Sequence, residues 1–283
     1  MQLGAKPGNS VELADHSIDQ QGDTQAAGLL IVNADDWGRD RLTTDLTLEC
    51  VQAGAVSSVS AMIFMEDSER AAGIARERGI DAGVHLNFTT PFSETGVSHQ
   101  LTDHQERIAR YLTRNRLAQV VFHPGLVDSF KYVVAHQLDE FRRLYGVEPA
   151  RIDGHHHMHL CANVVFAGLL PRRTIIRRNF SFARGEKSFG NRLYRRMIDR
   201  VAQRRHHLVD FLFSLAPLGE TGRLRRVFSL SRDFVVELES HPVNVSEHRF
   251  LAGGEIFRQA GDIPVATAFA PLVLLRATAR NSA

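Results

Sequence analysis

The stretch Gly28-Leu-Leu-Ile-Val-Asn-Ala-Asp-Asp-Trp-Gly38 is where the polar beginning of the chain gives way to a continuous apolar run. The consecutive apolar residues at 29–32 are typical of a strand that is buried on both faces, as in a parallel sheet. Polar residues follow at once, with Asp35 and Asp36 at the point where the strand is expected to end. The stretch therefore predicts a central parallel strand whose end carries two carboxylates.

The chain after this stretch alternates strand-like and helix-like segments. One helical pattern runs from Asp67 to near Gly79, and a second begins near Val127 and ends at Gly146. An Arg-rich helix is expected before residue 208. Further strands are expected at 56–63, 83–88, 150–153, 174–177, 208–213, 234–238 and 264–268. Such alternation predicts a parallel sheet, either open or closed into a barrel.

Length and composition fit one large domain. Residues 1–27 are rich in Gly, Asp, Gln and Ser with little apolar periodicity, and we expect them to form a mobile tail. Residues 28–283 are expected to form a single domain, because α/β barrels commonly exceed ~200 residues. The hydrophobic content of 43% is sufficient for a sizeable core.

Charge, cysteine content and hydropathy restrict the partners and the compartment. A net charge of +2 does not call for nucleic acid. Cys50 and Cys161 lie far apart, so neither a disulfide framework nor a thiolate zinc site is indicated. No apolar run reaches the ~18 residues of a membrane span, and the N-terminus lacks the apolar region of a signal peptide. We therefore expect a cytoplasmic protein without a membrane span. The sequence allows a homodimer but does not specify the oligomeric state.

Three of the expected strands carry groups that bind metals or move protons. Asp35 and Asp36 follow the first strand, His85 lies in the third, and the run Asp153-Gly-His-His-His-Met-His159 follows a later one. Because the carboxyl ends of parallel strands share one edge, these side chains are expected to converge. Two histidines and one carboxylate are a common ligand set for Zn²⁺ and other divalent ions. The carboxylate left over would then serve as a base.

Each of these groups also has a purely structural interpretation. The two aspartates can form an Asx turn, and a single histidine such as His85 is often a core residue. The cluster of four histidines favours metal or proton chemistry. If the cluster is extended, the period of two would point His156 away from the other three histidines.

Two further patterns leave alternatives open. His241-Pro242 places an imidazole after the strand at 234–238, and a Pro-fixed turn is an equal alternative. The His-Pro-Gly at 123–125 is interpreted as a turn. The Arg-rich stretch 172–205 would suit an anionic polymer or phosphate, although a solvated helix face is the commoner explanation.

Several motifs together resemble those of the YdjC-like carbohydrate deacetylases. They are Leu30-Ile-Val-Asn-Ala-Asp-Asp-Trp-Gly38, Ala55-Val-Ser-Ser-Val-Ser-Ala-Met62, Gly83-Val-His-Leu86, Ile152-Asp-Gly-His-His-His-Met-His159 and Val236-Glu-Leu-Glu-Ser-His-Pro242. The resemblance implies an α/β fold, a distorted TIM-like barrel of mainly parallel strands. It also implies one divalent metal ion, Mg²⁺ or Zn²⁺, and hydrolysis of N-acetyl groups on amino sugars.

Carried over by motif position, the resemblance implies a role for individual residues. Asp36 would be a metal ligand together with His85 and His155. Asp35 would be the base that takes a proton from the attacking water. The chain departs from the usual family pattern after the His-Pro, where Val243 stands in place of Gly, which weakens the assignment of a role to the preceding histidine.

The remaining expectations concern the leaving group and the substrate. His241 is the first choice for protonating the departing amine, and His157 or His159 is the second choice. His157 and His159 are also candidate substrate contacts. Arg177 or Arg178 would bind sugar hydroxyls or an acidic substituent. Two rival functions are a non-catalytic metal protein that binds an anionic polymer and a non-haem iron oxygenase, which uses the same ligand types. The sequence has neither a Gly-rich dinucleotide motif nor a P-loop, so no nucleotide cofactor is expected.

Overall fold

The computed structural model describes residues 28–115, 117–182, 185–219 and 221–269. The expected tail at 1–27 lies outside the described residues. Within the described part, the strands form one parallel sheet in the order β5-β4-β3-β2-β1-β7-β6. The strands are β1 (Leu29–Trp37), β2 (Ser58–Ala61), β3 (Ala82–Leu86), β4 (Arg151–Gly154), β5 (Ile175–Ile176), β6 (Phe211–Ser214) and β7 (Val235–Ser240).

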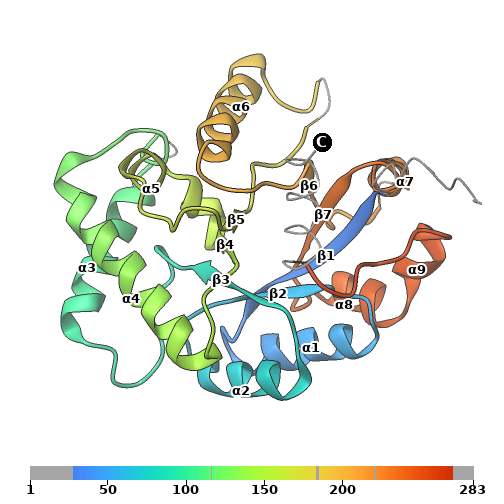
Figure 1. Ribbon diagram of the computed structural model, residues 1–283, viewed down its shortest axis with the longest axis horizontal. Helices are drawn as coiled ribbons and strands as arrows, with labels where there is room; N and C mark the ends of the chain where they lie inside the picture. The colour runs from blue at the N-terminus through green and yellow to red at the C-terminus, as the bar shows by residue number, and fades with distance from the viewer. Residues whose placement is uncertain (1–27, 116, 183–184, 220, 270–283) are drawn as a thin grey trace, which may run out of the picture.

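The sheet curls into a half-barrel with helices around it, which makes the fold a distorted TIM-like barrel (Figure 1). The α-helices are α1 (Arg41–Gln52), α2 (Ser68–Arg78), α3 (His99–Leu112), α4 (Val127–Tyr145), α5 (Ala162–Ala167), α6 (Phe189–Gln203), α7 (Thr221–Leu230), α8 (Val245–Ala252) and α9 (Glu255–Ala260). Two short 3₁₀ helices are η1 (Pro124–Leu126) and η2 (His155–Leu160). The helices expected to end at Gly79 and Gly146 are α2 and α4, and both glycines adopt the left-handed conformation that stops a helix.

The alternation of side chains along β1 explains how the barrel is built. Leu30 and Val32 point outward into the main core between the sheet and the helices. Ile31 points inward and belongs to a small apolar cluster that closes one end of the barrel. Asn33 and Asp35 continue the inward face toward the carboxyl end, and both are buried. The interior is therefore apolar at one end and polar at the other.

The two edges of the sheet approach each other beyond the regular strands. Ile175 in β5 forms a parallel bridge with His207, which precedes β6. Backbone bonds run from Ile176 N to His207 O at 2.9 Å and from His207 N to Thr174 O at 3.0 Å. The curl of the sheet therefore brings its first and last strands to the same side of the molecule.

The strand expected at 264–268 does not form. Only Val265 makes a bridge, to Leu30, and Ala266 N donates to Leu30 O at 2.8 Å. The reason is that Pro264 has no N–H to donate, and β2 pairs with β1 from Asn33 onward, which leaves room for a single bridge beside Leu30. The other expected strands are present, with ends displaced by one to three residues from the expected bounds.

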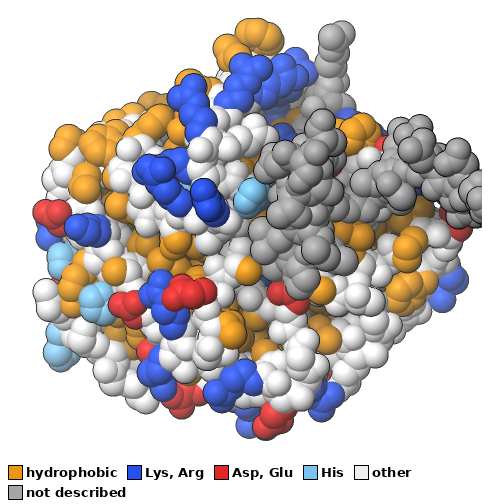
Figure 2. Space-filling model, in the orientation of Figure 1, with side chains coloured by type: hydrophobic (Ala, Val, Ile, Leu, Met, Phe, Trp, Pro, Cys, Tyr) orange, Lys and Arg blue, Asp and Glu red, His pale blue; other side chains and the backbone are white. Residues whose placement is uncertain are grey.

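Charge is unevenly distributed over the face shown in Figure 2. Lys and Arg side chains gather over α6 at the top of the view, whereas both signs of charge are mixed over the lower helices. No helix among the described residues is long and apolar enough to cross a membrane.

Candidate active site

A β-bulge at the end of β1 brings two neighbouring aspartates to the same place. The register of β1 against β2 shifts between Ala34 and Trp37, and Asp36 has a φ of 66°. A bulge of this kind adds one residue and redirects a side chain. Asp35 and Asp36 both lie at the buried polar end of the barrel.

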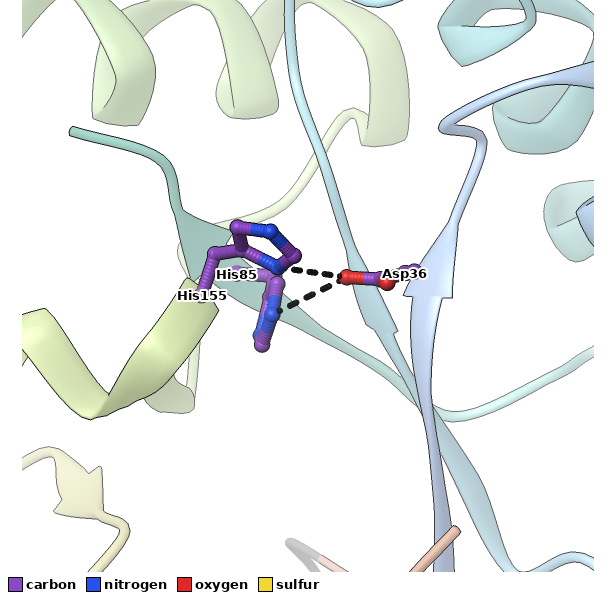
Figure 3. A group of neighbouring side chains, drawn as sticks. All are labelled: Asp36, His85 and His155. Atoms are coloured by element: carbon purple, nitrogen blue, oxygen red, sulfur yellow. Dashed lines mark hydrogen bonds and ion pairs between the residues drawn. The ribbon is translucent and has the colours of Figure 1, made fainter. Parts of the chain in front are cut away.

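Asp36, His85 and His155 converge on one point, as Figure 3 shows. The Oδ1 atom of Asp36 lies 2.9 Å from Nδ1 of His155 and 3.3 Å from Nε2 of His85. All three side chains are buried. They come from the ends of β1 and β3 and from η2, which follows β4, so the parallel sheet has brought together residues that are distant in sequence.

The electrostatics of this cluster favour a positive charge at its centre. Burial alone would raise the pKa of Asp36, but its contacts with His155 and His85 hold that pKa well below the ordinary value. Burial would lower the pKa of His85, yet the nearby carboxylates of Asp35 and Asp153 raise it to about 10. The carboxylates thus attract a proton or another cation to the place where the two imidazoles meet.

The second nitrogen of His85 is held by a carboxylate. Nδ1 of His85 lies 2.7 Å from Oδ1 of Asp153, and the other oxygen of Asp153 accepts from Arg151 at 2.6 Å and from Ser60 at 2.6 Å. In the neutral imidazole that binds a metal, this contact holds the proton on Nδ1 and leaves the lone pair of Nε2 directed toward Asp36. Nε2 is buried and makes no hydrogen bond. A histidine oriented by a carboxylate is the usual arrangement around a bound metal, so these residues fit a divalent cation.

Asp35 lies beside the cluster and is fixed by two neighbours. Its carboxylate accepts hydrogen bonds from both terminal nitrogens of Arg177, at 2.6 and 2.7 Å, and from Nδ2 of Asn33 at 2.8 Å. Its Oδ2 atom is 3.9 Å from Nε2 of His85. Since Oδ2 accepts one of these bonds, it keeps a lone pair for a further proton.

Arg177 occupies the middle of a buried network of carboxylates. Besides Asp35, its guanidinium contacts Glu237 at 2.7 Å, Asp153 at 3.1 Å and Glu239 at 3.2 Å. The side chain is 1% exposed. A guanidinium that is surrounded in this way is poorly placed to bind sugar hydroxyls, which was the role expected from the sequence. Its position favours orientation of Asp35 instead.

Sequence reasoning missed several members of this network. Glu237 and Glu239 stand two residues apart on β7, as Arg151 and Asp153 do on β4, and each pair faces the barrel interior. The signal was present, because charges at alternate positions within an otherwise apolar strand share one face. Gly83 leaves space for the network, since a Cβ atom there would lie 2.8 Å from Cζ of Arg151.

The histidine cluster is not extended, so the period-two expectation is wrong. Residues 155–160 form η2, in which His156 and His157 have left-handed φ values of 56° and 57°. His157 is partly exposed, with Nε2 3.1 Å from Oε2 of Glu239. His159 is fully buried and pairs with the carbonyl of Arg177 at 2.9 Å, and burial lowers the pKa of His159 to about 3.

The remaining expected site residues fall in two different places. A ring nitrogen of His241 lies within 4.8 Å of carboxylate oxygens of Asp35 and Glu239. His241 therefore stands at the mouth of the same site. Arg178 instead donates to the carbonyl of Asp210 and lies 3.1 Å from Asp199, so it links the segments before β6 and in α6.

Two cavities share Phe180, whose ring centroid lies 4.5 Å from that of His157. The cavity lined by His157 itself has a volume of about 430 Å³. Its lining includes His156, His157, Phe180, Asn191, Tyr194 and Arg195. The second cavity, of about 600 Å³, includes Phe180, Phe182, Phe213, Lys187 and Arg226. Space for a ligand with ring-like and polar parts therefore lies next to His157.

The fold and the cluster define a class of protein: a parallel α/β half-barrel with two histidines and a carboxylate converging at the ends of its strands. Within that class, a sequence model of the family described as YdjC-like protein matches residues 29–261, and the chain belongs to this family.

Curated relatives carry two functional names. A chitooligosaccharide deacetylase of Serratia marcescens is 31% identical over 133 residues, which cover 47% of this chain and 51% of that protein. A carbohydrate deacetylase of Homo sapiens is 33% identical over 149 residues, which cover 50% of this chain and 45% of that protein. The matches to these relatives thus span about half of their length.

A solved structure confirms the fold. The crystal structure of a protein of Enterococcus faecalis V583, suggested to be a cellobiose-phosphate cleavage protein, has a TM-score of 0.60 and 17% sequence identity. The match covers 87% of this chain and 99% of that one. At this level of identity the likeness concerns the architecture of the chain.

Proposed function

We propose that the protein is a metal-dependent hydrolase that removes the acetyl group from an N-acetylated sugar. The observation that carries the proposal is the convergence of Asp36, His85 and His155 beside a further carboxylate, that of Asp35. The names of the relatives support the substrate class, since both describe deacetylation of carbohydrates.

The proposed ligands are Asp36, His85 and His155. Imidazole nitrogens suit Zn²⁺ and similar ions better than Mg²⁺, which prefers an all-oxygen shell, so the donor set favours Zn²⁺ of the two expected metals. A bound divalent cation would lower the pKa of a water molecule and polarise the acetyl oxygen. Asp153 supports the site by holding His85 through Nδ1.

The other residues supply the proton transfers that amide hydrolysis needs. Asp35 would take the proton of the attacking water, with its orientation fixed by Arg177 and Asn33. The amine must leave as a neutral group, so it requires a proton. His241 would deliver it, because its imidazole stands near Asp35 at the mouth of the site. His157, paired with Glu239, is the second choice.

The cavity beside His157 would hold the sugar. Its lining combines the ring of Phe180 with amide and guanidinium groups from α6. An aromatic face and a few polar donors are the groups that a sugar ring and its hydroxyls require. We therefore expect the acetamido group to point toward Asp36 and the remaining sugar residues to extend along the two cavities.

The test is a screen for acetate release from N-acetylated sugars and oligosaccharides. The protein is stripped of metal and reconstituted with Zn²⁺ or Mg²⁺, and His85→Ala serves as the inactive control. Activity that depends on added metal and is absent in His85→Ala would support the proposal. Release of acetate by the metal-free protein would contradict it. Turnover without oxygen is also required, because the same ligand types occur in non-haem iron oxygenases.

A further inference from the structure

Helix α6 exposes an apolar stripe that nothing covers in the described part of the chain. Phe189, Leu193 and Met197 are 72%, 54% and 46% exposed. They are spaced four residues apart and therefore share one face of the helix. The opposite face packs on the protein through Ile198 and Ala202, which are buried. The exposed stripe is thus an outward surface and not a partly formed core.

The same outward face carries unpaired positive charge. Arg196, Arg200 and Arg204 are exposed and also repeat at a spacing of four. None of the ion pairs between described residues involves them. The only acidic residue of α6, Asp199, is buried and paired with Arg178. Figure 2 shows the resulting group of Lys and Arg side chains around the projecting helix, with hydrophobic side chains at its outer edge.

We propose that α6 docks on the surface of an anionic phospholipid membrane. Apolar side chains on one face with arginines around them are the pattern of a helix that lies in the lipid interface. The apolar stripe would enter the boundary between headgroups and acyl chains, and the arginines would contact lipid phosphates.

Two other occupants fit the surface less well. A second copy of the chain, docked face to face, would bring the arginines of both helices together, which is unfavourable. A nucleic acid would pair with the arginines but would leave the apolar stripe without a partner, because most such contacts are polar. A lipid surface satisfies both features at once.

Docking of α6 would also fix the position of the candidate active site relative to the lipid surface. Asn191, Tyr194 and Arg195 of α6 line the cavity that contains His157. These residues lie on the side of α6 away from the apolar stripe, so docking would hold the cavity one helix diameter, ~10 Å, from the lipid surface. The inference does not depend on the proposed reaction, because vesicle binding is measured without turnover.

The experiment is sedimentation of the full chain with vesicles of phosphatidylcholine alone or with about 30% phosphatidylglycerol. One variant combines Phe189→Ser, Leu193→Ser and Met197→Ser, and a second combines Arg196→Gln and Arg200→Gln. The matched controls are Leu42→Ser with Phe257→Ser, exposed apolar residues of α1 and α9, and Arg76→Gln with Arg78→Gln on α2. Circular dichroism and thermal melting show that each variant is folded.

We expect binding to anionic vesicles that weakens with salt, and a loss of at least about tenfold in each α6 variant but not in the controls. Absence of binding to anionic vesicles would overturn the proposal. Binding that survives loss of the apolar stripe would also overturn it, since simple adsorption of charge would suffice. A dimer that the apolar variant dissociates, without vesicle binding, would show that a second copy is the partner instead.

Discussion

Replacement of Asp153 by Asn should impair metal binding through the tautomer of His85. Three donors, Arg151, Ser60 and Arg177, point at one oxygen of Asp153, whereas the other oxygen lies 2.7 Å from Nδ1 of His85. The amide oxygen of Asp153→Asn will therefore face the three donors, and its NH₂ group will face His85. A donor at this position forces the proton onto Nε2, where it occupies the nitrogen that points toward Asp36.

The expected magnitude follows from this single contact. Loss of a residue that orients a metal ligand typically lowers metal affinity by about 10- to 100-fold. The loss of a buried charge beside two arginines will also lower the free energy of unfolding, by about 3 kcal/mol. Isothermal titration with Zn²⁺ measures the affinity, and chemical denaturation measures the stability and the folded fraction.

Glu237→Gln is the matched control for the loss of charge. Glu237 pairs with the same Arg177 at 2.7 Å, but it makes no contact with His85. Glu237→Gln should therefore bind Zn²⁺ within about threefold of the unchanged protein. Wild-type affinity in folded Asp153→Asn, or an equal loss in both variants, would refute the tautomer reasoning.

Three further predictions test individual residues. Asp35→Asn should keep metal but lower kcat by about 10² to 10⁴, whereas Asp36→Asn should lose metal affinity and regain activity with excess metal, and the reverse pattern would exchange the two roles. His241→Ala should slow acetate release from an N-acetyl sugar more than from an activated acetyl ester, whose leaving group needs little protonation, and equal losses would indicate a structural turn. Because burial lowers the pKa of His159 to about 3 from 6.5, the folded state binds fewer protons, and the contribution of His159 to stability is lost as the pH falls below about 6.5. The stability difference between the unchanged protein and His159→Gln should therefore shrink by about 1 kcal/mol between pH 7 and about pH 5.5 in urea denaturation, and a constant difference would contradict the assignment.

Local patterns were sufficient for the parallel sheet and for the position of the cluster. The apolar run that becomes β1 and the alternation of strands with helices predicted a parallel α/β fold. The rule that strand ends share one edge predicted that the two aspartates, His85 and the histidine run would converge, and the family resemblance implied Asp36, His85 and His155 within that group. These inferences succeed because strand burial and strand direction depend on residues close together in the chain.

Tertiary structure decided which way the side chains point and which charges they meet. The bulge that turns Asp36 and the 3₁₀ turn that redirects His157 depend on backbone angles set by neighbouring elements. The placement of Arg177 among carboxylates from three other strands depends on the register between them. A periodic pattern specifies the face that a residue occupies, but not its partners across the barrel. The sequence by itself therefore determined the parallel sheet and the edge at which its polar residues gather, and only the folded barrel placed Arg177 against Asp35.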